Sequence, residues 1–169
     1  MGIEIFTLFS VGPEAVRPLL VAAESSHERE DWALTAFNGF PTAMVFRPDD
    51  VHSGSMHYMF FPARGRQEFH HHPGARCVVL LGDVDMHIHF STADRDANPE
   101  STAQTRTVPA LTLTAVRFAP HLWHSFETAG DDGVGVLGLT FHDNDDVADL
   151  PAITDALMED RTVYWSSVA

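Results

Sequence analysis

The stretch EFHHHPGARCVVLLGD, residues 68–83, is the most informative part of the chain for both fold and site. Three consecutive histidines, His70, His71 and His72, precede a short apolar run that ends in a Gly-Asp turn. Because alternate side chains of an extended strand project from opposite faces, we expect His70 and His72 on one face and His71 on the other. Two imidazoles at this spacing can chelate a single metal ion, and a third ligand must then come from elsewhere in the chain.

Short apolar runs continue on both sides of this stretch. From about residue 43 the chain consists of runs of 5 to 9 residues separated by turn-forming residues, a pattern that is typical of β-strands. These runs cover residues 43–47, 56–61, 76–81, 84–90, 111–118, 124–128 and 133–141. The polar segment between two of them, residues 91–109, is expected to be a long exposed loop. Since no helical pattern separates these strands, the sequence favours an all-β sandwich or barrel over a parallel α/β fold.

Helical patterns lie at the two ends of the chain. Pro13 stands between a glycine and a glutamate, which is typical of a helix start, and apolar residues recur at helical spacing up to residue 24. A second helical pattern begins at Asp149. With 169 residues and no linker or repeat, we expect one domain over residues 1–169. Its expected parts are a barrel core at about 42–142, an N-terminal helical extension at 1–41 and a C-terminal helical tail at 143–169.

Composition limits the partners and the chemistry. The formal net charge is −14, which repels phosphate backbones and anionic lipid, so no nucleic acid and no membrane partner is expected. All ten basic residues are arginines, which excludes lysine Schiff-base chemistry. Cys77 is the single cysteine, and the N-terminus has no basic signal region, so we expect a cytoplasmic protein without an internal disulfide.

Two segments resemble the motifs of the cupin superfamily. Residues 65–82, GRQEFHHHPGARCVVLLG, resemble the first cupin motif: a glycine, His-x-His, usually a glutamate, and a closing glycine. Residues 120–126, PHLWHSF, resemble the second motif, in which a proline turn precedes the last metal-binding histidine. The resemblance covers about residues 42–142 and is that of a small single-domain cupin. It implies an antiparallel jelly-roll β-barrel with a divalent metal at the barrel mouth. With the helical patterns at the two ends, the expected fold is an all-β jelly-roll barrel with short flanking α-helices at the N- and C-termini.

The resemblance implies that His70, His72 and His124 hold this metal. The chain departs from the family pattern at Arg76, which stands where the first motif has its glutamate, and a guanidinium cannot bind a cation. The second motif also lacks its usual glycine shortly before His124. What remains is a set of three imidazoles, which favours a transition metal. Iron is the leading candidate, with zinc, nickel, copper or manganese as alternatives.

Other residues are candidates for the surroundings of the metal. Arg76 needs an anionic partner inside an apolar barrel, which is either an internal carboxylate such as Glu68 or the carboxylate of a substrate. Tyr58, Phe60 and Trp123 are either pocket walls or ordinary core. Arg76 and Tyr58 are the candidate catalytic residues.

His87 and His89 form a second pair on one face of a predicted strand. Their face either looks into the barrel, where they could supply a fourth ligand or an acid/base group, or points to solvent. We expect solvent, because Val84, Met86 and Ile88 form the apolar face of that strand.

The predicted function is that of a metal-dependent cupin enzyme acting on a small organic substrate, for which Arg76 favours an anion. Among cupins, three-histidine sites resemble those of Fe(II) dioxygenases that act on thiols, β-diketones or aromatic hydroxy-acids, and this is the leading interpretation. One alternative is a metal Lewis-acid cyclase or isomerase of the polyketide-cyclase kind. Another is a non-catalytic cupin that binds a small molecule or metal. Besides its substrate, the expected partner is a second copy of the chain in a homodimer.

Overall fold

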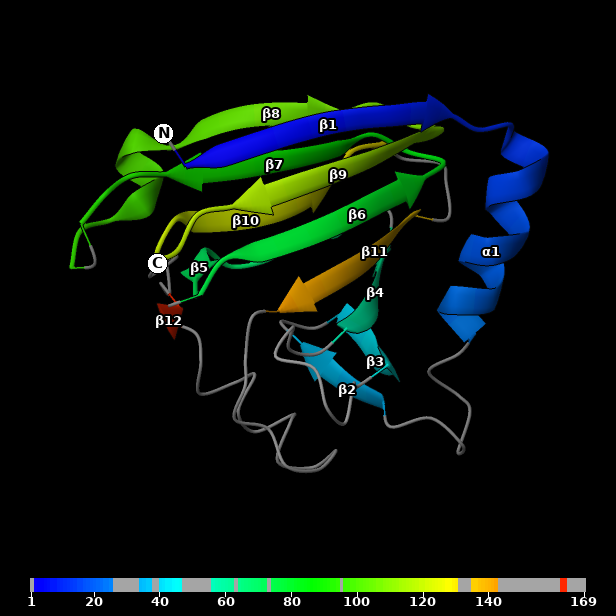
Figure 1. Cartoon of the computed structure of the whole chain (residues 1–169), viewed down its shortest axis with the longest axis horizontal. Helices are drawn as coiled ribbons and strands as arrows, with labels where there is room; N and C mark the ends of the chain where they lie inside the picture. Colours follow the sequence, from blue (N-terminus) through cyan, green and yellow to red (C-terminus); the bar gives the residue numbers. More distant parts are fainter. Residues whose placement is uncertain are drawn as a thin grey trace.

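The computed structural model describes residues 2–25, 34–37, 40–46, 56–62, 64–72, 74–94, 96–130, 135–142 and 162–163. In these residues the chain forms two antiparallel β-sheets with a helix at one end (Figure 1). The described helices include none that is long and apolar enough to cross a membrane. The C-terminal helix expected from Asp149 onward lies outside the described residues.

The larger sheet has seven strands, and its strand order is far from the order along the chain. From one edge to the other it contains β1 (Ile3–Ser10), β9 (Thr112–Phe118), β6 (Arg76–Gly82), β11 (Gly135–His142), β4 (Met56–Pro62), β3 (Phe40–Phe46) and β2 (Leu34–Phe37). The smaller sheet has five strands, in the order β12 (Thr162–Val163), β5 (His70–His71), β10 (Trp123–Thr128), β7 (Met86–Ser91) and β8 (Gln104–Val108). All pairs are antiparallel, and the chain repeatedly passes from one sheet to the other, as in a jelly roll.

The hydrophobic core fills the space between the two sheets. Along β6 every second residue is buried, so that Val78 and Leu80 point inward, and β7 contributes Met86 and Ile88 from the opposite sheet. For β7 this alternation is the period of two that the sequence showed. The core therefore fixes which face of each strand looks into the barrel.

A helix covers part of the outer face of the larger sheet. Helix α1 (Pro13–Ser25) confirms the predicted N-terminal helix, and its buried residues Val16 and Leu20 pack against Leu81, Leu137 and Leu139. These leucines alternate with the inward-pointing residues of β6 and β11.

Strands β1, β2, β8 and β12 were not among the predicted strands, and β8 and β1 show why. β8 lies within residues 91–109, which were expected to be a loop, and the 3-10 helix η2 (Pro99–Thr102) lies there as well. The loop prediction failed because β8 is polar and mostly exposed, so that its pairing with β7 leaves no hydrophobic pattern. β1 was not predicted because residues 1–41 were expected to form a helical extension. Its residues Ile3 and Ile5 pack against the core.

Candidate metal centre

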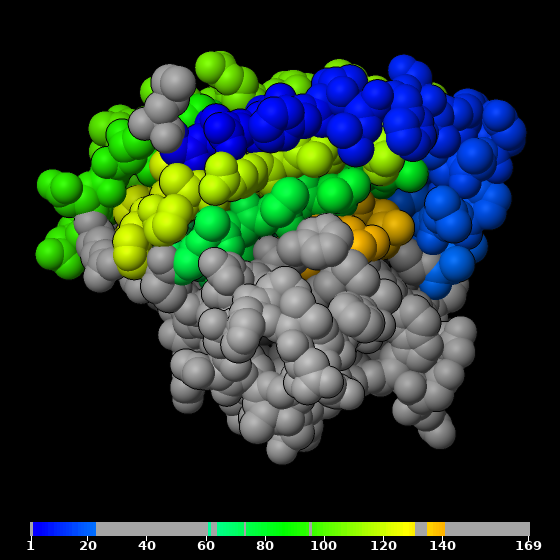
Figure 2. Space-filling model, in the orientation of Figure 1, coloured from blue at the N-terminus to red at the C-terminus, as the bar shows by residue number. Residues whose placement is uncertain are grey.

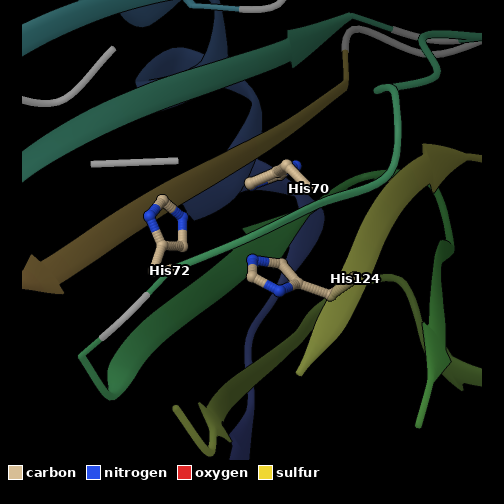
Figure 3. Close-up of side chains that lie close together, drawn as sticks. All are labelled: His70, His72 and His124. Carbon is tan, nitrogen blue, oxygen red and sulfur yellow. The ribbon is translucent and has the colours of Figure 1, made fainter. Parts of the chain in front are cut away.

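The three histidines predicted as metal ligands lie together in the structure (Figure 3). His70 is on β5, His72 follows two residues later, and His124 lies on the neighbouring strand β10 as the register partner of His70. The ring centroids are 4.4 Å apart for His70 and His124, 5.1 Å for His70 and His72, and 5.5 Å for His72 and His124. One ring nitrogen of each residue lies within 4.8 Å of the other two.

Backbone carbonyls hold two of these rings in place. The Nδ1 atom of His70 lies 3.0 Å from the carbonyl oxygen of Glu68, and that of His124 lies 2.9 Å from the carbonyl oxygen of Leu122. Since a carbonyl only accepts, Nδ1 of each ring carries the proton and donates it. In this tautomer the lone pair of each ring is on Nε2, as in many metal-binding histidines.

One side of the His124 ring is covered by apolar side chains. The ring of Phe118 stacks on it with 4.3 Å between centroids and 18° between planes, and Phe126 contacts it edge-on at 6.1 Å. Leu122 and Phe118 belong to the core cluster between the sheets. These contacts fix the plane of the His124 ring.

Burial also sets the protonation state of His124. Loss of hydration lowers its pKa from 6.5 to about 4, the hydrogen bond to Leu122 opposes this change, and the charges of Arg76 and His71 lower the pKa further. His124 is therefore neutral at neutral pH, as a metal ligand must be.

The turn between β9 and β10 secures His72. His121 has φ +61°, the left-handed conformation that favours glycine, and its backbone N–H donates to the carbonyl of His72 over 2.7 Å. The turn is thus formed without the glycine that the second cupin motif usually has before its last histidine. His121 thus adopts a conformation that usually requires glycine, and its backbone N–H holds the segment that carries His72.

Arg76 is buried on the inner face of the larger sheet, with 2% of its surface exposed. Its Nη1 donates to the carbonyl of Ala75 over 3.1 Å, and its charge acts on His124. Among the described residues, the carboxylate of Glu68 forms no ion pair with this guanidinium. The interpretation of Arg76 as a substrate-binding group stays a prediction.

The other predicted neighbours lie in different places. Tyr58 lies on β4 opposite Leu139, and Phe60 lies opposite Leu137; their side chains are outside the described part of the structure. Trp123 is buried against His71, with 4.5 Å between ring centroids. It adjoins His124 on β10 and therefore projects from the opposite face of that strand.

His71, His87, His89 and Cys77 project away from the three clustered imidazoles. His71 packs against Trp123 on the other face of β5, as alternation predicted, although it is buried rather than solvated. His87 and His89 lie on the outer face of β7, where their Nδ1 atoms hydrogen bond to threonine hydroxyls of β8, and His89 also contacts Glu127 at 2.9 Å. Burial raises the pKa of the Cys77 thiol, which disfavours the thiolate that would bind a metal.

Sequence reasoning missed the aromatic and backbone contacts that hold the three rings. Phe118 and Phe126 read as ordinary core residues, and nothing in the local sequence shows that β9 places Phe118 against His124. The sequence shows that both phenylalanines lie in predicted strands, one of which also carries His124. This pattern predicts core residues and does not distinguish residues of the site.

Comparisons with known proteins support the fold. No family model and no curated protein matches the chain. Among solved structures, similar ones are a hypothetical protein from Leishmania major (TM-score 0.56, 12% identity, 84% of this chain and 86% of that one) and CapF with the inhibitor 3-isopropenyl-tropolone (0.55, 13%, 77% and 33%). A third is a dTDP sugar isomerase from Desulfovibrio desulfuricans G20 (0.51, 11%, 98% and 85%). The chain matches about a third of the length of CapF.

These similarities confirm the predicted fold class. Together with the two antiparallel sheets, they show that the chain has an antiparallel jelly-roll fold. At 11% to 13% identity they concern the fold alone.

Proposed function

We propose that the chain is a metal-dependent cupin enzyme in which His70, His72 and His124 hold a divalent transition metal. The convergence of these three buried imidazoles is the observation that carries the proposal. Metal–nitrogen bonds are about 2.0–2.1 Å long, so three donors on one ion lie roughly 3–4 Å apart. Donors within 4.8 Å need only small side-chain rotations to reach that arrangement.

The chemistry of the donors favours particular metals. The three described donors are neutral nitrogens, which suit iron, zinc, nickel or copper better than magnesium or calcium. A metal with three protein ligands keeps open coordination positions, where it can bind dioxygen and substrate or polarise a carbonyl group. We propose iron and an oxygenase reaction as the leading function.

The protein groups around the site would select an anionic substrate. Three neutral ligands leave the charge of a divalent cation uncompensated, and the guanidinium of Arg76 adds a further positive charge beside His124. Positive charge in an apolar interior favours the binding of an anion. A substrate carboxylate would be attracted by this charge, and a guanidinium can donate two hydrogen bonds to such a group.

Hydrophobic side chains cover one side of the site. Phe118, Phe126 and Leu122 exclude water from the side of the site where His124 lies, which strengthens electrostatic interactions there. The carbonyls of Glu68 and Leu122 keep the Nδ1 protons of His70 and His124 in place.

Oxygen consumption tests the proposed function. The chain, purified without a histidine tag, is loaded anaerobically with Fe(II) and supplied with catechol, cysteine, acetylacetone or salicylate while dissolved oxygen is followed. We expect oxygen uptake with at least one of these compounds and none in the matched variant His72→Ala. Stoichiometric metal without oxygen uptake across the panel would overturn the oxygenase function and favour a Lewis-acid cyclase or isomerase. A wild type that binds no metal would overturn the site itself.

A further inference from the structure

A band of exposed hydrophobic side chains lies on β1 and α1, which follow one another in the chain. In the described part of the chain, the large hydrophobic residues with about half of their surface exposed are Phe6 (52%), Leu8 (52%), Phe9 (58%), Leu19 (51%) and Val21 (47%). The first three belong to β1 and the other two to α1, and Figure 2 shows these elements in blue as one continuous rim. Large apolar side chains that are exposed close together in a fold usually mark a contact surface.

The strand that carries this band is a sheet edge. β1 pairs with β9 on one side and is the last strand of the seven-stranded sheet, so its other side presents backbone N–H and C=O groups to a partner. The edge of the smaller sheet is different, because the exposed residues of β8 are Gln104, Thr105, Arg106 and Thr107. Polar and charged side chains protect β8 from pairing, whereas hydrophobic side chains leave β1 open to it.

A β-bulge gathers the phenylalanines on one face. Residues three positions apart normally point to opposite faces of a strand, but the register of β1 shifts between Thr7 and Phe9. Phe6 is thereby paired with Ala115 and Phe9 with Leu113, two residues that share one face of β9. Ile3 and Ile5 point to the core on the other face. The bulge therefore serves to place both phenylalanines on the outer face.

Charge argues for a second copy of the chain as the occupant. Each copy carries a net charge of −14, so two copies approach best where the surface is locally neutral. β1 has one charged residue, Glu4, and its carboxylate is neutralised by Arg117 at 3.1 Å. A strand edge is also self-complementary, because a two-fold axis places it antiparallel to its own copy.

We propose that two copies of this chain associate through β1, with the two strands paired antiparallel about a two-fold axis and the phenylalanines of both copies buried. Each half-exposed phenylalanine offers roughly 100 Å² of apolar surface. The five residues together offer on the order of 400 Å² per copy, about half of the ~800 Å² that each partner buries in a stable interface. The paired backbones and flanking residues would supply the remainder.

Sedimentation equilibrium of the full chain tests this proposal. We expect the wild type to have twice the 18.7 kDa mass of one chain. The double variant Phe6→Ser/Phe9→Ser should raise the dimer dissociation constant by at least about 100-fold, and Leu8→Lys, which places a charge on the edge, should act in the same direction. The matched control Gln104→Ser/Arg106→Ser changes the other sheet edge and should leave the dimer unchanged.

Hydrogen exchange supplies an independent measurement if a variant fails to fold. In the wild type, amides of residues 3–10 should become more protected as the protein concentration rises, while those of residues 104–108 should not. A wild type that stays monomeric, or a dimer that is unaffected by both β1 variants in their folded state, would overturn the proposal. Concentration-independent exchange over residues 3–10 would do the same.

Discussion

The imidazoles of His70 and His124 face each other across the β5–β10 pair, with ring centroids 4.4 Å apart, although more than fifty residues separate them in the chain. The backbone pairing of the two strands brings them together. This relationship makes the histidine cluster a property of the fold, and it leads to specific expectations.

The first prediction concerns the ligands themselves. Replacing His124 by alanine removes one of three donors and should lower metal affinity by more than the roughly 10- to 100-fold that loss of an outer hydrogen-bond partner costs. Metal content after dialysis, measured by mass spectrometry, checks this. The matched control is His87→Ala/His89→Ala, which removes another same-face pair from a strand and should leave the metal content unchanged. Equal losses in both variants would show that the metal is not held by the predicted site.

The second prediction concerns the stability of the metal-free protein at acidic pH. The pKa of His124 is lowered from 6.5 to about 4 in the folded chain, so the unfolded chain binds a proton at this residue at a pH where the folded chain does not. The free energy of unfolding of the metal-free protein should therefore fall by up to about 3 kcal/mol as the pH decreases from 6.5 to 4. Urea unfolding at several pH values measures it. The variant His124→Gln should have a smaller slope over this range; an identical slope would contradict the assignment.

The third prediction concerns the turn that holds His72. His121 has φ +61°, so His121→Val places a β-branched side chain in the left-handed region and should destabilise the fold by about 1–2 kcal/mol. It should also weaken metal binding, because the N–H of residue 121 donates to the carbonyl of His72. His121→Gly can adopt the same backbone conformation and should retain metal. Thermal unfolding and metal titration of both variants test this, and loss of metal in the glycine variant would point to a role of the imidazole instead.

The fourth prediction concerns Arg76. If the guanidinium binds a substrate carboxylate, Arg76→Gln should weaken salicylate binding by roughly 30-fold or more, while metal content stays unchanged. Salicylamide, which lacks the carboxylate, should bind wild type and variant about equally. Binding can be followed through the absorption of the cobalt-loaded protein. Equal weakening for both compounds would instead favour a structural role for Arg76.

The fold was largely predictable because its signals are local. The apolar run at residues 76–81 identified β6, and alternation along residues 84–90 identified β7 together with the face that it buries. The same alternation separated His71 from His70 and His72. The polar edge strand β8 carries no such alternation, since only its last residue is buried. It is defined by pairing with β7, which a single sequence does not reveal.

The site was predictable only in part. Strand geometry placed His70 and His72 together, whereas His124 was found through its resemblance to a motif, because local pattern says nothing about which strands become neighbours. The stacking of Phe118 on His124 and the left-handed conformation of His121 depend on that same long-range arrangement. The sequence shows that the motif lacks its usual glycine. It does not show that His121 adopts the left-handed conformation in this turn.

The most direct test of the central claim is anomalous X-ray diffraction from crystals of the protein loaded with iron or zinc. We predict one metal peak with a ring nitrogen of His70, His72 and His124 each within about 2.0–2.2 Å of it. A metal peak elsewhere, such as on His87 and His89, with none between these three imidazoles would contradict the account.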